Sequence, residues 1–448
     1  MIAGARTVVA LAAHFEELKR QAVSLQAQFS ASRRGYFTPS EDEQTRHLLA
    51  SYWQARGALF EVIDACRRDA QPGDASYPHA FVVAYPAALL LVDAARYLRE
   101  AFAPNAVARA KLNEPDPHFR VPARVYDTVQ RSLVSTRHAW HLYVAMEYFA
   151  AHQAELRSLA CDPLFAELLR VIDRLEERVH VSTGRFVATL VEVRRQRAVA
   201  RVRGRWHRIL YRLQKLASSL AAEVYVYPAH RPALPQEVSK AILDLARPGD
   251  VFVTRKHYAL TNYFLPGYWP HAALFLGDAD ALVELGVDRH ENVQPRWGRL
   301  VGLDPVERRR VLEALKDGVW IRSAAAPLAC DALVVLRPRL TRHEVAAALA
   351  RGMFHEGKPY DFDFDFTRSD RLVCTEVVYR SYEGIGGMQF TLRRRAGRMT
   401  FSAEDLIRMA LERAGFEPVA VFAPDYNPEL LDGAAADEAL RATHDPGA

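Results

Sequence analysis

Apolar residues follow a helical period through the first half of the chain. Between residues 155 and 179 they recur mostly at steps of three and four, with charged residues between them, at Leu156, Leu159, Leu164, Leu168, Val171, Ile172 and Leu175. This spacing places the apolar side chains on one face of a helix. Residues 1 to about 225 share this character, with breaks at 70–77 and 105–117. The pattern predicts several helices packed as a bundle.

The pattern changes after residue 225. Three prolines lie between residues 225 and 235, so we expect a linker over 226–245. Apolar runs that predict strands follow at 251–254, 272–276, 282–285 and 332–336, with a final strand at 419–422. Helical spacing returns at 306–315, 342–352, 375–382 and 403–414. We therefore expect an α+β protein, with an N-terminal helical bundle at 1–225 and a domain with an antiparallel sheet at 246–448.

Composition narrows the class of protein. Half of the 448 residues are apolar, a quarter are charged, and the net charge is +5, as in folded globular proteins. The longest apolar run, 80–92, is too short to span a bilayer, and the N-terminal run is too short for a signal peptide. The cysteines are scattered without metal-binding spacing, so we expect reduced thiols, a cytoplasmic location and neither metal nor cofactor. They are Cys66, Cys161, Cys330 and Cys374.

One segment concentrates positive charge. Residues 194–215 contain nine arginine or lysine residues, no acidic residue and an apolar stripe. A solvated helix face and a surface that contacts an anionic membrane both fit this pattern. The candidate membrane contacts are Arg201, Arg205, Arg208 and Arg212. No nucleic-acid-binding motif accompanies the charge, so nucleic acid is not an expected partner.

Cys374 is the candidate nucleophile. Residues 375–382 predict a helix, which would place this thiol at the helix N-terminus. The positive end of the helix dipole favours the thiolate, and the unpaired backbone amide there can bind an oxyanion. A buried, inert cysteine is the alternative. It is the expected state of Cys66, Cys161 and Cys330, which lie among apolar residues.

His271 is the candidate general base. It begins the apolar run 272–276, and a strand end would hold the imidazole rigidly. A histidine that serves only packing is the alternative. The run 282–285 is expected to form the neighbouring strand through a hairpin turn at 277–280. Its Glu284 would then bind the imidazole, unless it is an ordinary surface glutamate.

Together these segments resemble the permuted papain-like cysteine hydrolases of the NlpC superfamily, in the YiiX/YebB-like branch. The resemblance rests on the order of His before Cys and on five motifs: Gly249-Asp250, Trp269-Pro270-His271, Glu284-Leu285-Gly286-Val287, Pro359-Tyr360-Asp361-Phe362 and Cys374-Thr375-Glu376-Val377-Val378-Tyr379. In the last motif Thr375 and Val377 replace the family's Ser and Leu. The resemblance covers about residues 245–425 and leaves the helical half outside.

The resemblance implies a permuted papain-like fold and a role for each motif. Cys374 would attack a carbonyl and form a thioester, His271 would act as general base, and Glu284 would orient the imidazole. The oxyanion would bind the Cys374 backbone amide and a second donor. The candidate oxyanion or substrate contacts are Tyr360, Tyr258, Thr375 and Trp269.

Three functions fit these residues. The first is amidase or peptidase action on a small amide, such as a cell-wall peptide fragment or an N-acyl amino acid. The second is hydrolysis or transfer of lipid acyl groups at a membrane surface, as in the related lecithin:retinol acyltransferase-like proteins. The resemblance favours the first, because the lipid branch typically has a histidine as its third residue. The third function, a non-catalytic binding or scaffold protein, is opposed by the complete set of Cys, His and Glu.

Overall fold

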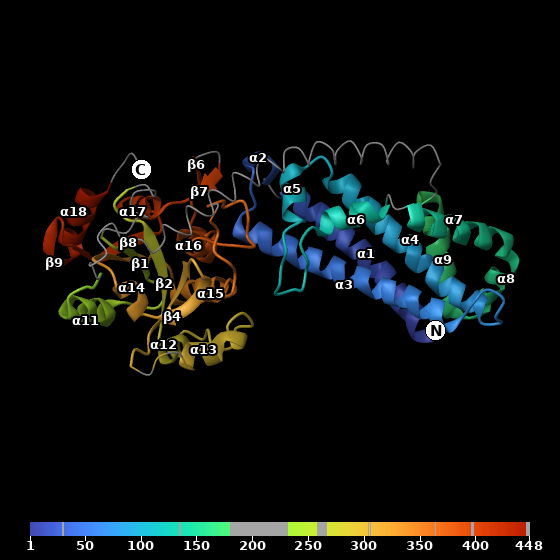
Figure 1. Ribbon diagram of the computed structural model, residues 1–448, viewed down its shortest axis with the longest axis horizontal. Helices are drawn as coiled ribbons and strands as arrows, with labels where there is room; N and C mark the ends of the chain where they lie inside the picture. The colour runs from blue at the N-terminus through green and yellow to red at the C-terminus, as the bar shows by residue number, and fades with distance from the viewer. Residues whose placement is uncertain are drawn as a thin grey trace. The chain divides into compact units, whose positions relative to one another are not determined.

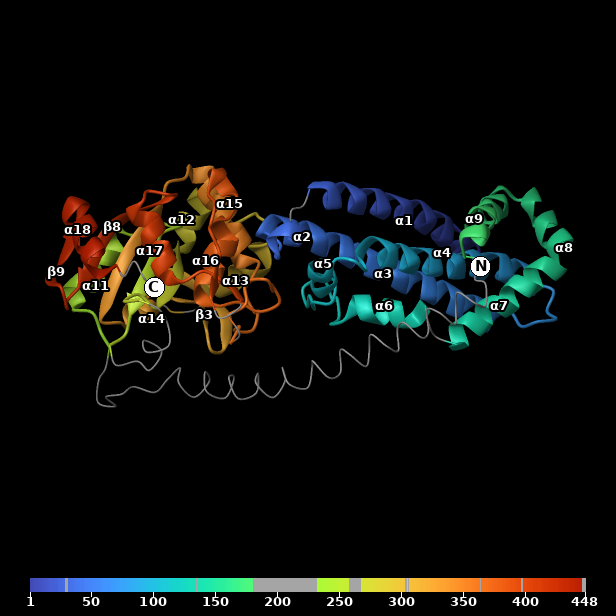
Figure 2. The same ribbon diagram turned by 90° about the horizontal axis from the view of Figure 1, so that it is seen from above.

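The computed structural model describes residues 1–28, 31–133, 136–179, 232–257, 267–302, 304, 306–362, 364–395 and 398–444. The chain forms two compact units, Met1–Trp206 and His207–Ala448, which are seen from two sides in Figures 1 and 2. The basic run at 194–215, with its four candidate membrane contacts, lies outside the described residues. So does Tyr258, one of the candidate oxyanion donors.

The N-terminal unit is built from helices, as the apolar period predicts. Its longer helices are α1 (Ile2–Gln28), α3 (Pro39–Asp69), α4 (Tyr77–Phe102), α7 (Thr136–Ala151) and α9 (Pro163–Val179). The shorter ones are α2 (Ala31–Arg34), α5 (Ala106–Lys111), α6 (Val125–Leu133) and α8 (Gln153–Ser158). Helices α1, α3, α4 and α9 pack on one another around a common apolar core. The helical prediction is confirmed for the described part of residues 1–179.

Two local features concern where helix α3 begins and how far helix α4 extends. Thr38 and Glu41 form a capping box at the start of α3, because each side chain binds the backbone N–H of the other residue. Helix α4 continues through Pro86 and is much longer than its apolar run. By length and composition α4 could cross a membrane, but 72 % of its most apolar stretch is buried inside the unit. That burial is typical of a core helix.

The C-terminal unit is organised around an antiparallel sheet. Among the described residues it has seven strands in the order β4-β3-β2-β1-β5-β8-β9. They are β1 (Val251–Arg255), β2 (His271–Gly277), β3 (Arg310–Leu315), β4 (Gly318–Ser323), β5 (Ala332–Pro338), β8 (Phe416–Ala423) and β9 (Asn427–Asp432). A separate hairpin joins β6 (Arg393–Arg395) to β7 (Arg398–Thr400). The predicted α+β class, a helical bundle followed by an antiparallel sheet domain, is confirmed.

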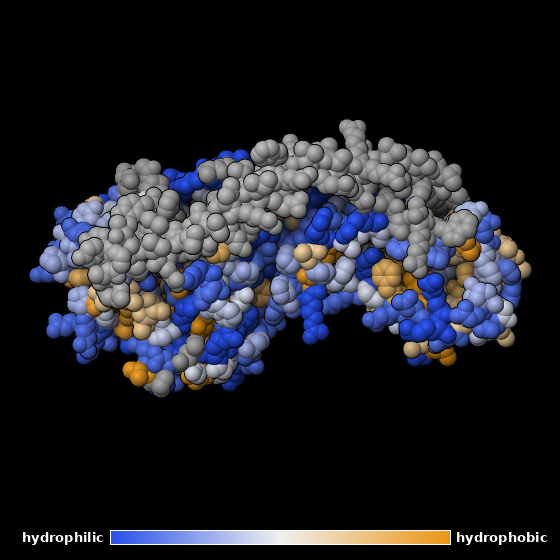
Figure 3. Space-filling model, in the orientation of Figure 1, coloured by the Kyte–Doolittle hydropathy of each residue, from blue (hydrophilic) through white to orange (hydrophobic). Residues whose placement is uncertain are grey.

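Helices pack against this sheet. They are α11 (Gln236–Leu245), α12 (Ala279–Glu284), α13 (Trp297–Gly302), α14 (Ala325–Leu328), α15 (Arg342–Met353), α16 (Cys374–Tyr382), α17 (Ala403–Leu411) and α18 (Gly433–Thr443). Helix α16 contacts β2, β3 and α15, and all of its residues are buried. Helix α11 occupies the second half of the expected linker, and its Ile242 packs with Phe252 and Phe422 in a sheet core. Figure 3 shows a largely hydrophilic visible surface with small, separate apolar patches.

Three predicted elements differ from the structure. Residues 279–284 form helix α12, where a hairpin turn at 277–280 and a strand at 282–285 were predicted, because the Asp278 side chain caps the helix by accepting the Ala281 N–H at 2.9 Å. Residues 310–315 form strand β3 instead of the end of a helix, because they pair with β4 across a tight turn at Lys316-Asp317. The strand at 419–422 is real but not final, since β9 and α18 follow it.

Candidate active site

The nucleophile candidate stands at the first position of α16. Val373 before it has an extended backbone, and the Cys374 side chain is only 6 % exposed. The helix is held from its far end by Tyr382, whose hydroxyl donates to the Gly249 carbonyl. Gly249 has a φ of +94°, and a Cβ there would lie 2.7 Å from Val345. The Gly-Asp turn therefore requires glycine and anchors the helix that carries the thiol.

His271 lies at the first position of β2, next to the thiol. Its register partner on β1 is Thr254, whereas the ladder between β2 and β3 starts only at Leu274. The imidazole is 22 % exposed and interacts with Cys374 directly through a hydrogen bond and through charge. Two backbone N–H groups, of Ala272 and Thr375, also donate to the Cys374 sulfur. The end of one strand and the start of one helix thus build the environment of the thiol.

The carboxylate at the imidazole comes from β3. Glu313 Oε2 lies 3.0 Å from His271 Nε2, and its side chain is almost fully buried. Arg322 of β4 lies on its other side, with Nε 3.5 Å from Glu313 Oε1. With Nε2 bound to Glu313, Nδ1 is the ring nitrogen that can exchange a proton with the thiol. A carboxylate in this position fixes the tautomer and orientation of the imidazole.

The electrostatics favour a thiolate and an imidazolium. Burial alone would raise the pKa of Cys374, but His271 and the two backbone N–H groups outweigh it and the pKa is lowered. Burial would likewise lower the pKa of His271, but Cys374 and Glu313 outweigh burial and raise the pKa to about 10. The two shifts have one cause, the mutual stabilisation of opposite charges. The thiolate of Cys374 therefore forms at a lower pH than that of an ordinary cysteine.

The other cysteines lack this environment. Burial raises the pKa of the Cys66 and Cys330 thiols, and no histidine contributes to either shift. Cys161 is exposed at the end of a short helical turn, Leu159–Cys161. The expectation that it is buried is therefore wrong, because Leu159–Cys161 is a surface turn between α8 and α9.

The structure does not place Glu284 at His271. It lies near the end of α12, exposed, with its carboxylate 2.9 Å from the Arg342 guanidinium. The prediction that Glu284 lies on a strand beside the imidazole is wrong, because Asp278 starts a helix where the hairpin was expected. The next strand along the chain is β3, and it brings Glu313 to His271.

Two further candidates, Trp269 and Thr375, have side chains that stabilise the surrounding fold. Trp269 is fully buried, and its indole N–H donates to Thr443 Oγ1 at 3.0 Å. Its backbone N–H donates to Glu404, which fastens the segment that leads into His271. The Thr375 hydroxyl donates to the Phe401 carbonyl at 2.7 Å. Neither side chain is free to contact a substrate, although the Thr375 N–H does reach the sulfur.

Tyr360 does lie at the site. It is partly exposed and joins Leu372, two residues before the nucleophile, through a parallel bridge. Burial, Cys374 and Asp361 all raise its pKa. The phenol therefore stays protonated and can donate a hydrogen bond. Among the described residues, no group of three or more His, Cys, Asp and Glu side chains is arranged to hold a metal ion.

Sequence reasoning missed Glu313, but the chain carries a signal for it. Asp317-Gly318 stands between two apolar runs, and this pair is typical of a two-strand hairpin. Gly318 has a φ of +112°, and a Cβ there would lie 2.6 Å from the Lys358 carbonyl oxygen. If this turn is interpreted as part of a hairpin, the sequence predicts a strand at 310–315. Glu313 is then a candidate carboxylate on a strand next to β2.

One comparison with known proteins finds a match to the C-terminal part of the chain. Residues 245–426 match the family model described as permuted papain-like amidase enzyme, YaeF/YiiX, C92 family. No curated protein and no solved structure matches the chain. The matched range includes β1 to β8 and contains Cys374, His271 and Glu313. The C-terminal part of the chain, residues 245–426, is therefore similar to the permuted papain-like amidase family.

Proposed function

We propose that the C-terminal unit is a cysteine hydrolase that cleaves an amide through a thioester on Cys374. One observation carries the proposal: His271 lies between the Cys374 thiol and the Glu313 carboxylate, 3.0 Å from the latter. Nucleophile, base and orienting carboxylate in this order form the arrangement of a catalytic triad. Glu313 takes the role that the sequence assigned to Glu284.

The first half of the reaction forms the thioester. The Cys374 sulfur attacks the amide carbon, a C–S bond forms, and the carbonyl oxygen becomes an oxyanion. The imidazolium of His271 gives its proton to the amide nitrogen as the C–N bond breaks, and the amine leaves. The backbone N–H of Cys374, at the first turn of α16, and the protonated hydroxyl of Tyr360 are the proposed oxyanion donors.

The second half releases the acid. His271, now neutral, takes a proton from water as the water oxygen attacks the thioester carbon. The C–S bond breaks, the carboxylic acid leaves, and the thiolate–imidazolium pair returns. Glu313 keeps the imidazole in one orientation through both halves and stabilises its charged form.

Trapping of the acyl-enzyme tests this proposal. Full-length protein would be mixed with a panel of N-acyl amino acids, peptide amides and acyl lipids, quenched in acid and analysed by intact mass and peptide mapping. We expect a substrate-derived acyl group on Cys374 and none on the Cys374→Ala variant. Equal turnover by wild type and Cys374→Ala would contradict the proposal.

Hydrolysis or transfer of lipid acyl groups is the second candidate function. The same triad chemistry would act on an ester or a thioester, so the lipid arm of the panel separates the two functions. The glutamate at the third position favours the amidase. Docking of residues 194–215 to an anionic membrane stays a prediction, and so does the cytoplasmic location.

A further inference from the structure

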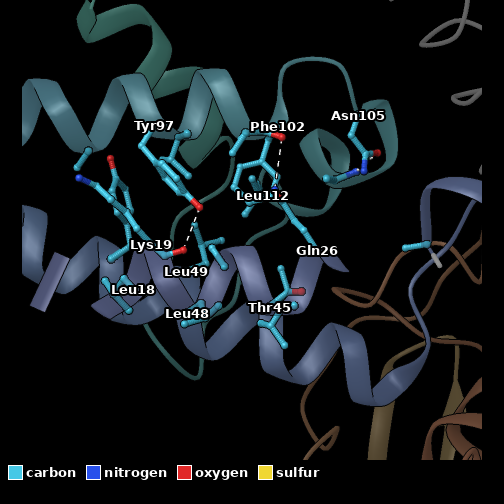
Figure 4. Close-up of a pocket in the computed structure, with 18 of the residues that line it drawn as sticks. Leu18, Lys19, Gln26, Thr45, Leu48, Leu49, Tyr97, Phe102, Asn105 and Leu112 are labelled. Carbon is cyan, nitrogen blue, oxygen red and sulfur yellow. Dashed lines mark hydrogen bonds between the residues drawn. The ribbon is translucent and has the colours of Figure 1, made fainter. Parts of the chain in front are cut away.

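The helical unit contains a cavity of about 280 Å³. It lies between α1, α3 and α4 and reaches the start of α5, as Figure 4 shows. Phe15, Leu49 and Leu98, all buried, are among the side chains that line it. The Tyr97 ring extends from α4 toward α1, where its hydroxyl donates to the Lys19 carbonyl at 3.1 Å. The cavity is therefore a built feature of the bundle.

An apolar space of this size is unusual in a folded core. Protein interiors pack at the density of organic crystals and leave few voids larger than a water molecule. An engineered apolar cavity of about 150 Å³ stays dry and takes up benzene. The cavity in this bundle is nearly twice that volume. An apolar occupant would remove this apolar lining from water and so stabilise the unit.

The charges at the cavity select the class of occupant. Lys19 is the only charged residue among those that line it, and its ammonium group is bound to Glu16 at 2.8 Å and to Asp93. Among these lining residues the one cation is therefore already paired and does not bind a buried anionic head group. An anionic group placed inside would have to break a buried ion pair.

Neutral polar groups lie at the outer part of the cavity. Gln26 is exposed and donates to the Ala101 carbonyl at 3.4 Å, and Asn105 caps α5 by accepting the Ala108 N–H. Thr45 of α3 is partly exposed and also lines the space. The deep part is thus hydrocarbon and the outer part is uncharged and polar.

We infer that this cavity binds the hydrocarbon chain of a single-chain amphiphile, such as a fatty acid or an N-acyl compound, with the polar head group at the outer end. The buried apolar lining takes the chain, and the exposed Gln26 side lets the head group stay in water. This site belongs to the helical unit and does not depend on Cys374.

Binding of a fluorescent fatty acid tests the inference. Full-length protein would be titrated with an 11-(dansylamino)undecanoic acid probe below its micelle concentration, and bound probe would be displaced with palmitate. We expect saturable binding by wild type and by Cys374→Ala alike. The variants Ala22→Phe and Ala101→Phe, each with a ring placed at the cavity lining, should weaken binding at least about tenfold. Ala13→Phe, an exposed position on the same helix outside the lining, is the matched control.

Two further experiments test where the fatty acid binds and whether a membrane can supply it. A diazirine fatty acid photolabels wild type without any substitution, and its label should map to lining residues of α1, α3 or α4. Incubation with phosphatidylcholine vesicles that carry labelled palmitate, followed by separation of protein from vesicles, tests a membrane source of the chain: labelled palmitate that stays with the protein comes from the bilayer. Labelling confined to the C-terminal unit, loss of binding in Cys374→Ala, or full binding by folded Ala22→Phe and Ala101→Phe would overturn the inference.

Discussion

Both units of this protein bury ionisable side chains, but they use them differently. In the helical unit Lys111 lies 2.7 Å from Asp42 and 2.9 Å from Glu114, and Arg46 bridges Asp42 and Asp116 at 3.2 and 3.1 Å. These five residues form a network of buried ion pairs. In the C-terminal unit the ionisable side chains compared with this network are the Cys374 thiol, the His271 imidazole and the Glu313 carboxylate. The His271 side chain is 22 % exposed.

The comparison shows that buried charge alone does not mark a reactive site. The network of Asp42, Arg46, Lys111, Glu114 and Asp116 contains no nucleophile. In the C-terminal unit one member is a cysteine, and the histidine beside it lowers the pKa of the thiol. The His271 side chain is also partly exposed. The following predictions test this difference.

The largest expected effect is loss of hydrolysis in Cys374→Ala and His271→Ala. Each removes a group that forms or breaks a bond, so we expect activity on an identified substrate to fall by about a thousandfold or more. Steady-state kinetics with the purified protein would measure it, with circular dichroism to show that each variant folds. Retention of a tenth of the activity by Cys374→Ala would contradict the assigned nucleophile.

The next effect distinguishes two glutamates. Glu313→Gln should lower kcat by about a hundredfold, because the amide no longer stabilises the imidazolium, whereas Glu284→Gln should stay within about twofold of wild type. The two variants make the same chemical change and so control for each other. A large loss in Glu284→Gln together with normal activity in Glu313→Gln would restore the original assignment.

A third substitution breaks the buried network in the helical unit. Lys111→Met leaves Asp42 and Glu114 without their shared partner, so we expect the free energy of unfolding of that unit to fall by about 3–5 kcal/mol. Denaturant melts followed by circular dichroism would measure the loss, and Arg124→Met, an exposed ion-pair residue, is the control. Specific alkylation of Cys374 in the same sample should be unchanged while the C-terminal unit stays folded.

The pH dependence of alkylation separates the cysteines. Because the pKa of Cys374 is lowered and that of Cys66 is raised, limiting iodoacetamide should label Cys374 first, and before Cys161 and Cys330. The rate should fall only when the pH drops through the lowered pKa of Cys374, since protonation removes the thiolate. Turnover should also fall as the pH rises through about 10, where His271 loses the proton that the leaving amine needs. Equal labelling of all four thiols in folded protein would count against the ion pair.

The smallest expected effect concerns residues 194–215. Full-length protein should bind anionic vesicles in low salt, and replacing Arg201, Arg205, Arg208 and Arg212 together by Gln should weaken binding at least several-fold, because each arginine that contacts the surface contributes about 1 kcal/mol, a factor of about five in affinity. Vesicle sedimentation at two salt concentrations would measure it, with neutral vesicles as the control. If the wild-type protein stays in the supernatant at low salt, the docking hypothesis is wrong.

Much of the fold followed from local pattern. The apolar period predicted the helices around Leu168 and Ile172, and the runs that begin at Val251 and Ala332 predicted strands that the sheet contains. The helical prediction succeeds because one period continues over residues 155–179. Runs of only a few residues fit a strand or a helix, so their surroundings decide their structure. The runs that begin at Val251 and Ala332 pair with each other in the sheet, whereas capping by Asp278 and pairing with β4 decided the structure of 282–285 and 310–315.

The sequence by itself determined that Cys374 begins a helix and that His271 begins a strand, since both properties depend on a few neighbouring residues. It also predicted the family whose model matches residues 245–426, through motifs that local order preserves. Only the tertiary structure decided that Glu313 is the carboxylate at His271 and that the helical unit contains a cavity. Both depend on which segments pack side by side. Strand pairing and helix packing bring together residues that are far apart in the chain, and the local sequence pattern around a residue does not determine its partner.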